Sequence, residues 1–183
     1  VRTWAIAYAL GVTALAASGL FQVLQLEELY ELRAVLESYA VQTATPYVTD
    51  EDLSRLERGL ETSQEAVECG EPERFLEIDT AFHALLIERA PNSRLSVMMD
   101  SIEDLTHRLH YLGLQCVENI HESLLEHREI LGALRKRDSQ LAARLMNDHL
   151  QAVKDRLLPS VNLSGESPDA GVGAQRGAKN AGQ

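Results

Sequence analysis

The chain has 183 residues and a net charge of −11, which allows one helical domain with a real core but not two large ones. No clustered Lys/Arg surface is evident to match a phosphate backbone, so we expect any DNA binding to come from another segment. Cys69 and Cys116 form no CxxC pair and are too few for a disulfide framework, which favours buried thiols in a reducing, cytoplasmic setting.

Residues 1–25 form an apolar N-terminal segment. No charged side chain occurs between Thr3 and Leu26, and Trp4 to Leu24 is about as long as a helix that spans a bilayer. Interspersed Gly, Thr, Ser and Gln weaken the membrane interpretation. Two interpretations stay open: a membrane or signal segment, or the remnant of an upstream winged helix-turn-helix.

Residues 26–159 contain no alternating strand pattern and predict an all-α, antiparallel bundle of about six helices. The first helix is expected from Leu26 to the region of Thr43, before Pro46. Thr49 and Asp52 form a capping box for a second helix that stops at Gly70. A third helix is expected to begin at Pro72.

The third helix is expected to end at Pro91 and Asn92, where Asn92 or Ser93 caps a fourth helix that fades near Gly113. The fifth covers about residues 118–137. Asp138 caps a sixth that ends at Pro159. Residues 160–183 are rich in Gly, Ala, Ser and Asn and are predicted to be a disordered tail.

Helical rotation of about 100° per residue separates the six histidines by direction. His149 and His127 fall on the apolar arcs of the sixth and fifth helices, and His83 falls at the edge of the arc of the third. His121 and His107 point away from theirs. A lone inward histidine is usually a hydrogen-bonded core residue, but three together favour a shared site.

Asp79 lies on the same apolar face as His83, four residues earlier. A buried carboxylate demands a cation or several donors. Together with His127 and His149, these side chains predict a site for Zn²⁺, Ni²⁺, Mn²⁺ or Fe²⁺, whose preferred ligands are imidazole nitrogens and carboxylate oxygens. Four protein ligands leave one or two positions open, where the carboxylate of a ligand could bind.

Arg33 shares a helical face with Leu29, Leu36 and Ala40 and cannot lose its charge on burial, so it requires an anion. A ligand-binding role and an intramolecular ion pair both remain open for Arg33. Arg108 on the flank of the fourth helix is a weaker effector-binding candidate.

These residues together resemble the FCD domain, the effector-binding domain of FadR-type regulators in the GntR family. The matching stretches are LYELR at Leu29, LE at Leu36, FLEIDTAFH at Phe75, EHREIL at Glu126 and HL at His149. The Asp-x₃-His pair followed by two later histidines matches the ligand positions of the metal-binding branch of that family.

The resemblance implies a homodimeric transcriptional regulator in which a small organic acid binds at the metal and controls DNA binding by a winged helix-turn-helix. The basic and polar residues of such a DNA-binding domain are largely absent from this chain.

Two other functions are compatible with a helical bundle. A metal-dependent enzyme on a helical bundle would need inward Glu-x-x-His pairs, whereas Glu118-x-x-His121 faces outward, and no obvious inward Glu could serve as general base beside the predicted ligands. A membrane-tethered helical interaction module is the other alternative. We therefore expect a sensor and not an enzyme.

Overall fold

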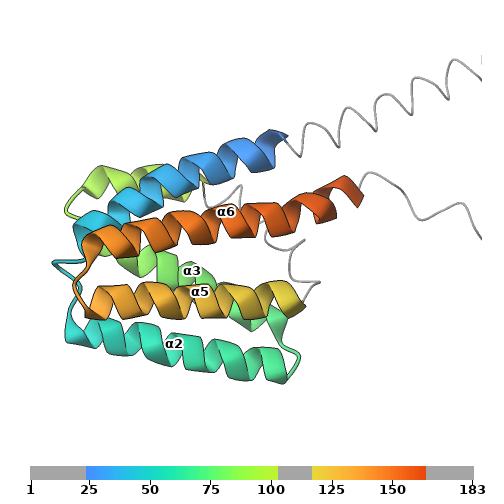
Figure 1. Cartoon of the computed structure of the whole chain (residues 1–183), viewed down its shortest axis with the longest axis horizontal. Helices are drawn as coiled ribbons and strands as arrows, with labels where there is room; N and C mark the ends of the chain where they lie inside the picture. Colours follow the sequence, from blue (N-terminus) through green and yellow to red (C-terminus); the bar gives the residue numbers. More distant parts are fainter. Residues whose placement is uncertain (1–23, 103–116, 164–183) are drawn as a thin grey trace, which may run out of the picture.

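The computed structural model describes residues 24–102 and 117–163 of the chain (Figure 1). Six helices lie in these ranges, and no strand is found there: residues 24–44, α2 (Asp50–Glu68), α3 (Pro72–Arg89), residues 93–102, α5 (Val117–Arg135) and α6 (Ser139–Leu163). Successive long helices run in opposite directions in Figure 1. The predicted all-α antiparallel bundle is therefore confirmed.

Three predicted helix caps are present. The Thr49 hydroxyl accepts a hydrogen bond from the backbone N–H of Asp52, whose carboxylate accepts one from the N–H of Thr49 in return. Asn92 accepts from the N–H of Arg94, and Asp138 accepts from the N–H of Leu141. Each cap satisfies an N–H group that the first turn of a helix leaves without a partner.

The core lies between the layers of the bundle. In Figure 1, α5 lies between α2 and α6, and it contacts both, while α2 also contacts α3. The helix at residues 24–44 contributes Tyr30, which is fully buried, and α6 contributes Met146. Polar side chains of the helix at residues 24–44, α3, α5 and α6 are also buried in this bundle.

The structure corrects two predictions. The sixth helix continues through Pro159 to Leu163. The proline removes its own N–H donor and crowds the carbonyl one turn earlier, but this cost falls near the end of the helix, and the residues after it complete a last turn. Cys69 was expected to be buried, but its thiol is free and exposed, since it follows the last turn of α2 immediately before Gly70, which has a positive φ of 77°.

Other predictions concern residues outside the described ranges. These include Arg108, His107, Cys116, the tail from residue 164 onward and the N-terminal segment up to residue 23. Within the described helices, none is both long and apolar enough to cross a membrane.

Candidate metal centre

Four side chains from three helices converge inside the bundle. Asp79 and His83 lie one turn apart on α3, His127 lies on α5 and His149 lies on α6, and one potential ligand atom of each lies within 4.8 Å of the others. The Nε2 atoms of His83 and His127 are 3.2 Å apart. Asp79 Oδ1 is 3.7 Å from His127 Nε2. The residues selected from sequence are thus all brought to one point.

The donor set suits a transition-metal ion. Three imidazoles and one carboxylate match the preferences of Zn²⁺, Ni²⁺ and Fe²⁺. Two ligands of one ion, each bonded at about 2.0–2.2 Å, lie no more than about 4.4 Å apart. The observed limit of 4.8 Å therefore requires only a small closing of the widest pair.

A buried carboxylate orients His83. Glu37, on the helix at residues 24–44, is completely buried, and its Oε2 lies 2.5 Å from His83 Nδ1. A proton held on Nδ1 by this bond leaves the Nε2 lone pair directed at the cluster. The other oxygen of Glu37 accepts from Arg33 Nε at 2.7 Å. Burial raises the pKa of Glu37, but the opposing effect of Arg33 and His83 is larger. The pKa is therefore lowered overall, and the carboxylate stays ionised.

The same arrangement recurs at His149. Its Nδ1 lies 2.7 Å from Oε2 of Glu126, which leaves Nε2 for the cluster. Arg156 donates to both oxygens of Glu126, at 2.7 and 2.8 Å, and to the hydroxyl of Ser123. Burial raises the pKa of Glu126, but hydrogen bonds from Arg156 and His149 outweigh it and bring the pKa to about 2.

His127 occupies the most enclosed position. Its side chain is 1% exposed, and its ring stacks on Phe82 with a centroid distance of 4.4 Å. Burial, followed by the neighbouring His149 and His83, lowers the pKa of His127 well below 6.5. Burial also lowers the pKa of His149, against the opposing effect of Glu126. Both imidazoles are therefore neutral at neutral pH, which is the form that binds metal.

Sequence reasoning missed the orienting residues. From the sequence, an inward Glu was considered only as a general base, and neither Glu37, which is fully buried, nor Glu126, which is half-buried, was assigned a role. Helical spacing could have indicated two members of these groups: Glu37 lies one turn after Arg33, and Arg156 lies two turns after His149. Glu126 and Glu37 each use both oxygens in hydrogen bonds, so neither resembles a free general base.

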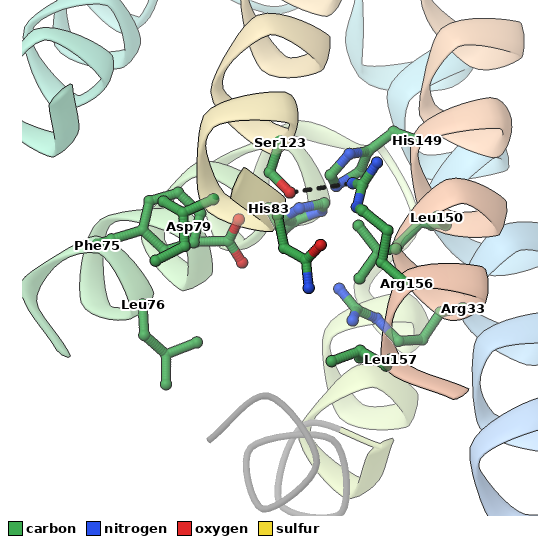
Figure 2. Close-up of a pocket in the computed structure, with 13 residues that line it drawn as sticks. Arg33, Phe75, Leu76, Asp79, His83, Ser123, His149, Leu150, Arg156 and Leu157 are labelled. Carbon is green, nitrogen blue, oxygen red and sulfur yellow. Dashed lines mark hydrogen bonds between the residues drawn. The ribbon is translucent and has the colours of Figure 1, made fainter. Parts of the chain in front are cut away.

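A pocket adjoins the cluster (Figure 2). It is an open pocket, and its space of about 520 Å³ includes solvent at the mouth. Asp79, His83 and His149 line it, whereas His127 does not. Any coordination position left open by the protein would therefore face this pocket. Arg33, predicted as an effector contact, also lines it, at 5.1 Å from the Tyr30 ring.

These features define an all-helical domain with a buried Asp/His cluster that opens onto a pocket. The FCD domain family matches residues 28–152. The chain belongs to the FCD domain family, and the resemblance to GntR-family regulators is confirmed.

Known relatives are transcriptional regulators. The HTH-type transcriptional regulator YdhC of Bacillus subtilis is 31% identical over 120 residues, which cover 63% of this chain and 52% of YdhC. The HTH-type transcriptional repressor RspR of Escherichia coli is 29% identical over 127 residues, covering 68% of this chain and 54% of RspR. The chain thus spans about half the length of these relatives.

A solved structure is similar as well. Streptococcus agalactiae GntR matches with a TM-score of 0.60 and 26% identity, over 72% of this chain and 58% of that protein. The helical arrangement described above is therefore shared with a GntR protein.

The lowered pKa values of His127 and His149 predict how the metal-free domain responds to pH. The unfolded chain binds protons at these residues near pH 6.5, whereas the folded chain does not. The stability that these two neutral histidines contribute is therefore fully present above pH 6.5 and is lost as the pH falls below it. Urea denaturation with chelator present should give a lower midpoint at about pH 5.5 than at about pH 7.5.

Glu37 and Glu126 act in a separate window, because their pKa values are lowered from 4.5 and their contribution is lost only at more acidic pH. A His127→Gln, His149→Gln variant should show a weaker dependence between the two pH values. A midpoint that stays constant or rises on acidification of the parent would contradict the prediction.

Proposed function

We propose that the domain is the ligand-sensing part of a GntR/FadR-type transcriptional regulator. Asp79, His83, His127 and His149 would hold a divalent transition metal, which is Zn²⁺, Ni²⁺, Mn²⁺ or Fe²⁺. A small organic acid would bind the metal through its carboxylate. The single observation that carries the proposal is the convergence of four donors within 4.8 Å at the wall of a pocket.

The bound metal would supply a Lewis-acidic anchor for the carboxylate, and the chain's own residues would fix its surroundings. Glu37 and Glu126 orient the rings of His83 and His149, and Arg33 lines the pocket as the proposed effector contact. Arg108, the second proposed effector contact, rests on the sequence alone. We assign no catalytic residue.

Communication with DNA would pass through the helix at residues 24–44. Arg33 and Glu37 lie on this helix, and Glu37 hydrogen-bonds directly to His83. A ligand that shifts His83 therefore acts on this helix through one buried hydrogen bond. The relatives named HTH-type regulators are about twice as long as the matched stretch, and we place the helix-turn-helix outside residues 28–152. The coupling requires that the ligand favour one position of the helix over another.

The partner that we propose for the domain is a second copy of itself. Leu32, Val35 and Tyr39 follow one another at three- and four-residue spacing on the helix at residues 24–44, and each is at least 43% exposed. Such an apolar stripe is typical of an interface. Val97 and Met98 on the helix at residues 93–102 are also exposed.

Removing two of the four donors should abolish metal retention. The purified chain is expected to contain near-stoichiometric metal by elemental mass spectrometry, and the His127→Ala, His149→Ala variant should contain almost none. His121→Ala is the matched control, because His121 is exposed on the same helix as His127. Metal contents that are equal in the parent and the double variant would refute the proposed site.

The residue that orients His149 provides a second test. Glu126→Gln keeps an oxygen near His149 Nδ1 but removes the charge that holds it, so metal affinity should fall by about 10- to 100-fold. Chelator competition measures this change. Glu122→Gln is the control, because Glu122 also pairs with Arg156 but makes no contact with His149 that the structure records. Equal affinities for the two variants would argue against an orienting role for Glu126.

A charge in the exposed apolar stripe should disrupt the dimer. Val35 is 68% exposed, so Val35→Glu would bury an unpaired carboxylate in the interface while leaving the monomer core intact. Light scattering coupled to size exclusion should report a dimer for the parent and a monomer for the variant. Leu125→Glu, on α5, replaces another exposed apolar residue and should remain dimeric. A monomeric parent would exclude the proposed dimer.

A further inference from the structure

We propose that the ligand of this pocket is a monocarboxylic acid with an apolar body, and not a sugar acid or a dicarboxylic acid. This inference rests on the proposed function and narrows its ligand class. Three observations carry it: the side from which the cluster is accessible, the charge balance around the cluster, and the composition of the pocket walls.

The cluster is accessible from one side only among the described residues. Asp79, His83 and His149 face the pocket, while His127 is enclosed behind them and stacked on Phe82. A carboxylate that completes the coordination of a metal must therefore enter from the pocket. The remainder of the ligand then lies against the pocket walls.

The charges around the cluster call for a single anion. Among the buried and partly buried side chains that the structure describes there, Asp79, Glu37 and Glu126 bring three negative charges, and Arg33 and Arg156 bring two positive charges. Glu122 also pairs with Arg156, but its side chain is 61% exposed, so water screens its charge and it is left out of this balance. A divalent ion would turn this single net negative charge into a single net positive one. One carboxylate neutralises it. Among the residues that the structure describes, the arginines that a second carboxylate would meet are Arg33 and Arg156, which already pair with Glu37 and Glu126, so the cost of removing it from water would be poorly offset.

The walls beyond the cluster are mainly apolar. Figure 2 shows the Asp79 carboxylate and His83 directed into the pocket, with Leu76 and Leu157 farther from them. The apolar side chains that line the pocket come from three helices: Phe75, Leu76, Ile120, Leu150, Val153 and Leu157. These walls favour a hydrocarbon body.

Among the described residues, few uncharged polar groups are available to a ligand with several hydroxyls. In that part of the chain, Asn119 and Ser123 are the uncharged polar side chains that line the pocket, and the Ser123 hydroxyl already accepts a hydrogen bond from Arg156 at 3.1 Å. The hydroxyls of a sugar acid would lose water without gaining partners, which disfavours binding. An aliphatic body makes no hydrogen bonds with water that it could lose, and its burial against apolar walls is favourable.

The test is calorimetric titration of the purified, Zn²⁺-loaded chain with acetate, butyrate, hexanoate, succinate and glucuronate. Affinity should increase along the first three acids, by up to roughly fourfold for each methylene that becomes buried. Succinate and glucuronate should bind more weakly than hexanoate.

A conservative variant distinguishes wall contacts from effects at the metal. Val153→Thr preserves the shape of a half-buried pocket residue but adds a hydroxyl, so it should weaken hexanoate binding several-fold and leave acetate binding and zinc content unchanged. Val67→Thr on α2 is the matched control, because Val67 is also partly buried but lies outside the pocket. Equal effects of the two variants on hexanoate would overturn the inference.

The outcomes separate this inference from the proposed function. Zinc binding together with stronger binding of succinate or glucuronate would overturn the inference and leave the sensor function standing. Zinc binding without affinity for any of the acids would also overturn it. A chain that neither holds zinc nor binds an acid would refute the proposed function, and the inference with it.

Discussion

The burial of ionisable groups at the centre of a small helical bundle is the constraint on which the rest of this structure depends. An unpaired carboxylate or guanidinium in such a place costs several kcal/mol. Two of the carboxylates here are matched in this way: Glu37 lies between Arg33 and His83, and Glu126 lies between Arg156 and His149. Because Glu37 and Glu126 hold the Nδ1 atoms of His83 and His149, the Nε2 atoms of these two histidines are available to a common cation.

The two hydrogen-bonded chains hold different parts of the bundle together. Arg33 and Glu37 connect the helix at residues 24–44 to α3, whereas Glu126 and Arg156 connect α5 to α6. Occupancy of the cluster would act on both connections at once. A domain of this design can link the chemistry at its centre to the position of a surface helix, which is the requirement for a sensor.

Membership of the FCD family fixes the fold, but not the ligand. A shared fold hosts many ligands, and the choice among them lies in the side chains that line each pocket. Among the described residues, the charged groups of the pocket are largely paired with one another, and apolar side chains from α3, α5 and α6 line it as well. A ligand of the proposed kind would have to suit both the charge at the cluster and these walls.

The sequence alone determined the helices, their caps and the inward direction of the four donors. Those features depend on local geometry. Helical rotation places His127 and His149 on apolar arcs, and the spacing of Thr49 and Asp52 is a capping box that indicates a helix start. Local rules failed at two helix ends. They placed the end of α6 at Pro159 and the Cys69 thiol in the core, whereas the helix continues to Leu163 and the thiol is exposed. The partners of the histidines were decided by tertiary structure, because Glu37 meets His83 across 46 residues and no periodicity within one helix contains that contact.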